Sequence, residues 1–141
     1  MTSPEPGRRW LIDKSALVRL DAAPNIEQWA SRINLGQVRI TTLTLLEIGI
    51  TARSAEEHRL SLRLPSVAAM AVENITIAIE RRAVAVQALL AESGQHRAPS
   101  PEQLLIAATA ELSDLTLLHL DKDLELIADL TGQPTERLAQ A

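Results

Sequence analysis

The sequence predicts a three-layer α/β domain with a mainly parallel sheet, and two observations support this prediction. Short apolar runs typical of buried strands occur at Trp10–Ile12, at Val38–Thr41 and at 115–120. Stretches with helical spacing of apolar residues separate these runs. Strands that alternate with helices favour parallel βαβ units, with helices on both faces of the sheet. The 141 residues are enough for one such domain with its own core.

Helices are expected between the strands in the first two thirds of the chain. They cover residues 14–20, 24–33, 42–54 and 54–64, and a longer helical pattern then runs over 73–94. Pro65 limits the fourth of these helices, and Gly94 is a typical C-terminal stop for the fifth.

The last third of the chain begins with a clear helix start, SPEQ at Ser100–Gln103. Serine at the cap, proline at the first helical position and glutamine at the third form a capping box. After the strand at 115–120, a helix over 122–130 is closed by Gly132. The tail at 133–141 either adds an edge strand or frays.

Composition and charge exclude several classes of protein. The formal net charge of −4 argues against a general nucleic-acid coat protein, but it allows an enzyme with an acidic metal site. The absence of cysteine excludes disulfides and thiolate metal sites. Two tryptophans are the only aromatic residues, which counts against folds that stack bases on aromatic platforms.

The two ends of the chain are expected to flank a single domain at 10–138. Residues 1–9 are polar and proline-rich and lack the apolar middle of a signal peptide, so we expect a loose tail on a cytoplasmic protein. No apolar run reaches the roughly 18 residues of a membrane helix, so no membrane partner is expected. Residues 139–141 are expected to form a C-terminal tail.

Acidic residues follow two of the predicted strands. Asp13 comes directly after the first strand, and Asp121 and Asp123 come just after the last one. Glu47 is an isolated acid in the apolar stretch LTLLEIGI, where it needs a partner if it is buried. Sites in parallel sheets form beyond the carboxyl ends of the strands, and clustered carboxylates without Cys or His suit Mg²⁺ or Mn²⁺. The residues therefore suggest a metal-dependent phosphoryl-transfer site at Asp13, Glu47 and Asp121.

Each of these acids also has a purely structural interpretation. Asp13 could cap the helix that follows it, and Asp121 and Asp123 could be the cap and first-turn acids of the last helix. Glu47 could pair with Arg19 or Arg53. Spacing alone leaves both interpretations open.

Three segments, taken in order, resemble the PIN-domain ribonucleases, especially the VapC-type toxins of toxin–antitoxin pairs. They are WLIDKSALVRL from Trp10, TTLTLLEIGITARS from Thr41, and PSPEQLLIAATAELSDLTLLHLDKDLELIA from Pro99. The similarity runs from about Trp10 to Leu138. It implies a PIN-like α/β/α sandwich and Mg²⁺- or Mn²⁺-dependent endonucleolytic cleavage of RNA. It also implies a homodimer that a cognate VapB-type antitoxin silences.

The resemblance assigns roles residue by residue. Asp13 matches the first acid of the family, Glu47 the second and Asp121 the last. Asp123 matches a frequent auxiliary acid, and Ser15 matches a hydroxyl residue that helps to hold the first acid.

The sequence departs from the family pattern at Gln103, where Asp is usual. An amide offers a carbonyl oxygen but no charge. Glu102 is adjacent, but one step along a helix is about 100° of rotation, so it does not automatically replace the missing carboxylate. Lys14 stands where Thr is common, and a solvated lysine is the expected interpretation. Weakened metal binding, or loss of nuclease activity, is therefore an expectation of the sequence.

Three basic or titratable residues near the site have weaker interpretations. His96 and Arg97 lie in the loop before the helix at Pro101, where a cation could meet an RNA phosphate. His119 lies in the last apolar strand and is expected to be a hydrogen-bonded core histidine.

Two other functions remain to be weighed against an endoribonuclease toxin. Gln103 motivates the first, a degenerate PIN module that binds RNA or an antitoxin without cutting. The second, a phosphate-accepting receiver domain, fits poorly, because receivers need paired acids after the first strand. Here Asp13 is followed by Lys14 and Ser15.

Overall fold

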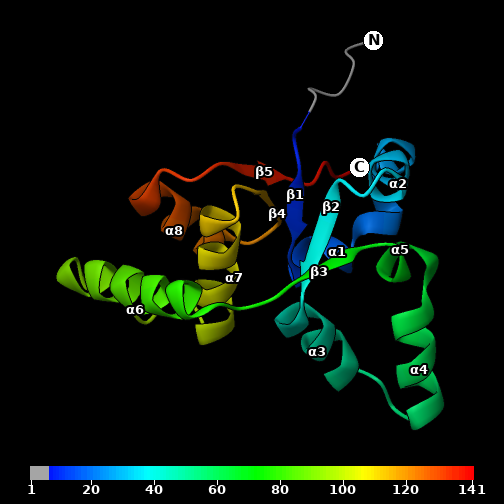
Figure 1. Ribbon diagram of the computed structural model, residues 1–141, viewed down its shortest axis with the longest axis horizontal. Helices are drawn as coiled ribbons and strands as arrows, with labels where there is room; N and C mark the ends of the chain where they lie inside the picture. The colour runs from blue at the N-terminus through cyan, green and yellow to red at the C-terminus, as the bar shows by residue number, and fades with distance from the viewer. Residues whose placement is uncertain (1–6) are drawn as a thin grey trace.

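The computed structural model describes residues 7–141 and contains a five-stranded sheet with helices on both sides (Figure 1). The strands are β1 (Trp10–Ile12), β2 (Val38–Thr41), β3 (Ala71–Glu73), β4 (Thr116–His119) and β5 (Thr135–Arg137). They lie in the order β3-β2-β1-β4-β5, and every neighbouring pair is parallel. The prediction of a three-layer α/β domain with a mainly parallel sheet is confirmed.

The helices follow the order that the sequence predicts. They are α1 (Lys14–Leu17), α2 (Ile26–Asn34), α3 (Thr42–Ile50), α4 (Ala55–Arg63), α5 (Pro65–Ala68), α6 (Ile77–Glu92), α7 (Pro101–Leu112) and α8 (Lys122–Thr131), with a 3₁₀ turn, η1, at Leu20–Ala22. The third predicted helix ends at Ile50 rather than at residue 54, and Pro65 begins a short helix of its own. No helix within residues 7–141 has the length and apolar character to span a membrane.

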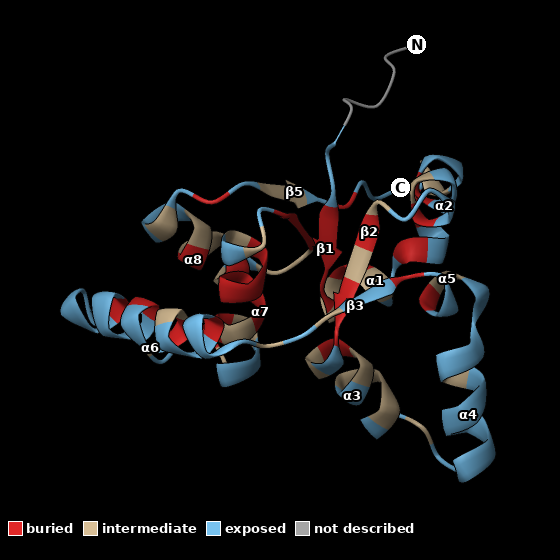
Figure 2. Cartoon of the chain, in the orientation of Figure 1, coloured by how far each residue is buried: buried red, intermediate tan, exposed pale blue. Residues whose placement is uncertain are grey.

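Alternate residues of the central strands bury two separate clusters, one on each face of the sheet. Leu11 and Leu117 pack with apolar residues of α6, α7 and α8. Trp10 and Ile12, from the same strand as Leu11, pack instead with α1 and α2. Figure 2 shows these central strands as the buried middle layer of the molecule. The alternation is the expected side-chain period of a strand, and here both faces are apolar because helices cover both.

The two edge strands are the least predictable part of the sheet. The sequence shows no apolar alternation at Ala71–Glu73 and does not predict β3. In the structure, Ala71 and Val72 are both exposed. The place of β3 is set by parallel pairing with β2. The tail at 133–141 forms the edge strand β5, which decides between the two interpretations of that segment. Of the tail expected at 1–9, residues 1–6 lie outside the part of the chain that the structure describes.

The strand order brings the ends of β1 and β4 together. Ile12 is level with Leu118 in the parallel register, so both strands end at the same edge of the sheet. The chain leaves β1 towards β2 and β3 and later returns on the other side to form β4. Open parallel sheets bind ligands at such a switch point, outside the carboxyl ends of the strands.

Candidate active site

A cleft of about 580 Å³ opens at this carboxyl edge. Four acids line it, Asp13, Glu47, Asp121 and Asp123, together with the cations Lys14 and Arg97 and the polar residues Ser15, Ser100 and Gln103. These side chains come from the ends of β1 and β4, from α3, and from the loop that leads into α7. The structure thus gathers in one place residues that lie more than a hundred positions apart in sequence.

Asp13 is held by the start of α1. Its Oδ1 accepts a hydrogen bond from the Ser15 hydroxyl at 2.7 Å and one from the Ala16 N–H at 3.2 Å. Ser15 in turn accepts a hydrogen bond from the Leu120 N–H at 2.8 Å, which ties the end of β1 to the segment after β4. Asp13 therefore does cap a helix, as its structural interpretation requires, and it also faces the cleft.

The surroundings of Asp13 oppose its charge. The residue is only 5% exposed, and this burial raises the pKa of its carboxyl above the usual 3.8. The hydrogen bonds from Ser15 and Ala16 oppose the rise without cancelling it. Within residues 7–141 no group donates a hydrogen bond to its second oxygen, Oδ2. A buried carboxylate with one free oxygen is suited to meeting a cation.

Asp121 has a similar arrangement at the start of α8. Its Oδ1 accepts a hydrogen bond from the Asp123 N–H at 2.8 Å, so Asp121 is the cap of that helix. The Asp121 N–H donates to Nδ1 of His119 at 3.1 Å. His119 is fully buried, and burial lowers the pKa of its imidazole. The expected core histidine is confirmed, and its contact with the Asp121 backbone fixes where that acid leaves the strand.

Glu47 projects from the second turn of α3. The helix begins at the edge of the sheet because Thr41, the last residue of β2, caps it by accepting a hydrogen bond from the Thr44 N–H. Loss of contact with water raises the pKa of the Glu47 carboxyl, Lys14 opposes the rise, and Glu102 and Asp13 add to it. No ion pair joins Glu47 to an arginine within residues 7–141, so the proposed pairing with Arg19 or Arg53 is wrong.

Gln103 lines the cleft, but its carbonyl oxygen is already engaged. That oxygen accepts a hydrogen bond from the Ser100 N–H at 2.9 Å, and the Gln103 N–H donates to the Ser100 hydroxyl at 3.1 Å. The predicted capping box is confirmed. The amide N–H₂ of Gln103 donates no hydrogen bond within residues 7–141, so it is available as a donor to a ligand, whereas one lone pair of the oxygen is already engaged by the cap. Glu102 is exposed and lies outside the lining of the cleft.

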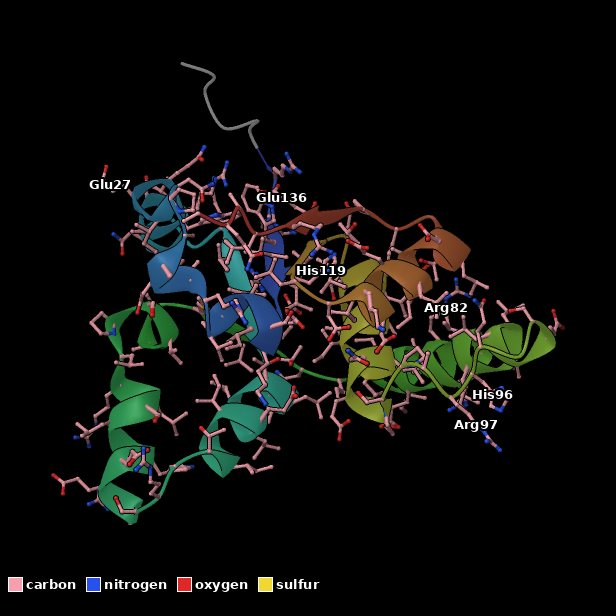
Figure 3. The ribbon with its side chains drawn as sticks, turned by 180° about the vertical axis from the view of Figure 1, so that it is seen from behind. Glu27, Arg82, His96, Arg97, His119 and Glu136 are labelled. Atoms are coloured by element: carbon pink, nitrogen blue, oxygen red, sulfur yellow. The ribbon has the colours of Figure 1, made fainter. Side chains whose placement is uncertain are left out.

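The loop before α7 separates the two basic candidates. Arg97 is exposed and lines the cleft, whereas His96 is partly buried and does not. Figure 3 shows both on the loop beside α6, at the edge of the molecule, and His119 near its middle.

The donor set fits a hydrated hard cation better than a closed protein cage. No group of three or more Asp, Glu or His side chains within residues 7–141 is gathered closely enough to hold a metal ion by itself. Mg²⁺, however, keeps several waters and is usually held by only one or two carboxylates. Asp13 and Asp121 meet that need, because each is anchored through one oxygen and faces the cleft.

Lys14 is the cleft residue whose position the sequence interpretation missed. Its side chain is partly buried and lines the cleft, a position that the interpretation as a solvated lysine did not specify. A signal was present: Lys14 directly follows Asp13 at the end of β1, so it starts from the same edge of the sheet.

Known proteins share both the sequence pattern and the fold of this chain. The PIN domain pattern matches residues 10–130. The chain is 58% identical over 131 residues to Ribonuclease VapC2 of Mycobacterium tuberculosis (strain CDC 1551 / Oshkosh). The matched region covers 93% of this chain and 93% of the relative. It is 34% identical over 128 residues to Ribonuclease VapC21 of the same strain, covering 91% of this chain and 92% of the relative.

Solved structures show the same fold at much lower identity. VapBC2 from Rickettsia felis, solved with a DNA fragment from its promoter, has a TM-score of 0.75 at 13% identity, covering 91% of this chain and 97% of that one. DNA-bound VapBC from Salmonella typhimurium has a TM-score of 0.69 at 18% identity, covering 92% and 98%. With its five parallel strands, its acidic cleft and these relatives, the chain belongs to the PIN domain family, in the VapC group.

Proposed function

We propose that this chain is an Mg²⁺- or Mn²⁺-dependent endoribonuclease that acts as the toxin of a type II toxin–antitoxin pair. The observation that carries the proposal is the convergence of Asp13, Glu47 and Asp121 on one cleft at the switch point of the sheet. The ribonuclease names of relatives up to 58% identical support the same reaction class.

Each residue of the cleft would have its own role in phosphodiester hydrolysis. Asp13 and Asp121 would hold the cation through the oxygens that their helix caps leave free, and Asp123 would assist from the next position that faces the cleft. A divalent cation, when bound, supplies positive charge that activates water and stabilises the phosphate. Glu47 would tune the site from α3, and Ser15 holds Asp13 in place. Arg97 would contact the RNA backbone at the rim.

We infer that the partner of this chain is a VapB-type antitoxin, that the chain forms a homodimer, and that it acts on RNA in the cytoplasm. Support for the antitoxin comes from structural neighbours that were solved as VapBC pairs, which share this fold over more than 90% of the chain. We take 10–138 as the domain and 139–141 as a short tail.

The test is cleavage of RNA by the purified protein with added Mg²⁺ or Mn²⁺. We expect cleavage that stops when EDTA is added and that Asp13→Asn reduces by at least a hundredfold, because Asn keeps the helix cap but loses the charge. Equal cleavage by the wild-type protein and Asp13→Asn would refute the mechanism and point to a contaminating nuclease.

A second candidate function is a degenerate PIN module that binds RNA or an antitoxin without cutting. It is favoured by Gln103, whose carbonyl oxygen is engaged in the helix cap and whose position lacks the usual carboxylate. Gln103→Asp separates the two functions. A gain of about 10–100-fold in activity or metal affinity would indicate an impaired site, the range expected for restoring an outer ligand.

The matched control for this substitution is Gln140→Asp, which adds the same charge at an exposed position outside the cleft. An unchanged, active enzyme in Gln103→Asp would mean that the carboxylates already present suffice. That result would dismiss the degenerate alternative.

A further inference from the structure

Lys14 carries a positive charge in the cleft that no neighbour neutralises by direct contact. Its side chain lines the cleft beside the acids. Within residues 7–141 it forms no ion pair and no side-chain hydrogen bond. Glu47 is close enough for the Lys14 charge to be felt, since it opposes the rise in the pKa of the Glu47 carboxyl. The ammonium is therefore available to a ligand.

Lys122, the only other lysine, shows that this placement is specific. Each lysine is the first residue of a helix and directly follows the aspartate that caps it, Asp13 before Lys14 and Asp121 before Lys122. Yet Lys122 is exposed and lies outside the cleft lining, whereas Lys14 is partly buried within it. Helix-start chemistry is the same for both, so it does not explain the position of Lys14.

Gln103 offers a second donor to the same cleft. Its oxygen accepts a hydrogen bond from the Ser100 N–H, while its amide N–H₂ donates no hydrogen bond within residues 7–141 and is free to donate to a ligand. A phosphodiester carries one negative charge on two oxygens, and a cleft lined by four acids would repel it. A lysine ammonium and an amide donor are complementary to such a group, with the lysine acting as a point charge.

We propose that Lys14 binds a phosphate of the RNA strand, with the Gln103 amide as a second donor, so that the cleft contains an anion site beside its carboxylates. The proposal deepens and rests on the proposed ribonuclease function. It assigns new roles to the two positions at which this chain departs from the family pattern. The lost carboxylate and the gained lysine both make the cleft less negative, by one unit of charge each.

The experiment measures RNA binding rather than cleavage alone. A short fluorescein-labelled single strand of RNA of mixed sequence is titrated with protein in Ca²⁺ buffer over a series of salt concentrations, and a gel verifies that the strand stays intact. We expect Lys14→Gln to weaken binding by about tenfold and to lower the slope of log affinity against log salt by about 0.7, the value for one phosphate contact on a single strand. Lys14→Arg should retain most of the slope, and Lys122→Gln should change neither quantity.

Gln103→Glu tests the second donor, because glutamate at this position still completes the capping box but presents a carboxylate instead of an amide. We expect weaker RNA binding and a higher KM. Melting curves of all variants check that the fold is intact.

An unchanged salt slope in Lys14→Gln would overturn the proposal. If that variant instead binds Mg²⁺ more tightly at constant slope, Lys14 serves only to offset Glu47, and the proposal fails. Wild-type protein that binds RNA with the expected slopes but never cleaves it would leave Lys14 as a phosphate ligand and refute the proposed nuclease. Wild-type protein that does not bind the strand at all would refute both.

Discussion

Asp13 combines helix capping with an unfavourable burial of charge. Its cap hydrogen bonds from Ser15 and Ala16 stabilise α1, but burial raises the pKa of the carboxyl. In the metal-free protein the folded state therefore holds this proton more tightly than the unfolded chain does. The free energy of unfolding then falls as the pH rises from about the usual value of 3.8 through the raised folded pKa, and it stays lower above that pH.

Asp13→Asn should therefore stabilise the metal-free protein at neutral pH while reducing cleavage by at least a hundredfold. Asparagine caps helices as well as aspartate does and can accept the same two hydrogen bonds, but it carries no charge. We expect a higher urea midpoint than wild type at pH 7 in EDTA, and a smaller fall of the midpoint between pH 4 and pH 7. Asp129→Asn, at an exposed position of α8, serves as the control and should change little. A lower midpoint for Asp13→Asn would contradict this account of the site.

At the scale of elements, the start of α7 links helix stability to the shape of the cleft. Ser100 caps α7 and Ser54 caps α4 in the same way, each accepting a hydrogen bond from the N–H three residues on. Only Ser100 lines the cleft and holds Gln103 through a reciprocal bond. The two serines are therefore a natural pair for separating the two effects.

Ser100→Ala and Ser54→Ala should each cost about 1 kcal/mol in the free energy of unfolding, the usual value for losing a cap. Activity should respond only to Ser100→Ala, because that change removes a hydroxyl that lines the cleft and one of the two hydrogen bonds that hold Gln103 and the loop at 97–100 in place. Urea unfolding and RNA cleavage measured on the same samples check both statements. Equal loss of activity in the two variants would mean that stability, rather than the cleft wall, is the cause.

Elements with strong local signals could be predicted from the sequence, and those without them could not. β1 and β2 are bounded by their apolar runs, and the capping box of α7 is visible in four residues. β3 is different, because its residues Ala71 and Val72 are exposed and bury no apolar face. It is a strand only because it pairs with β2. The site shows the same division. The acids at the strand ends were predictable from the sequence. The direction of the Lys14 side chain depends on neighbours far away in sequence, and the hydrogen bond to the Gln103 oxygen depends on the geometry of the helix cap.

At the scale of the whole molecule, the two buried clusters share the central strands, so the cleft and the core are expected to unfold together. A cation that binds only the folded state then stabilises the entire domain. At a concentration of one hundred times its Kd this amounts to about 2.7 kcal/mol.

Addition of Mn²⁺ or Mg²⁺ should accordingly raise the melting temperature by on the order of 10 °C at such a concentration, given roughly 3–5 °C per kcal/mol for a domain of this size. Asp13→Asn should lose most of this shift, and Asp129→Asn should keep it. Differential scanning calorimetry with and without EDTA measures the effect. The same rise in Asp13→Asn would show that the cation binds somewhere other than the cleft.

The hydrogen bond from the Leu120 N–H to Ser15 joins residues that are 105 positions apart. During translation, β1 is made first, but its neighbour β4 and the edge strand β5 come from the end of the chain. Asp13 and Asp121 therefore cannot face each other on a ribosome-bound fragment that lacks the last quarter of the sequence. Any activity that needs both side chains therefore begins only after Asp121 has been synthesised and β4 has paired with β1.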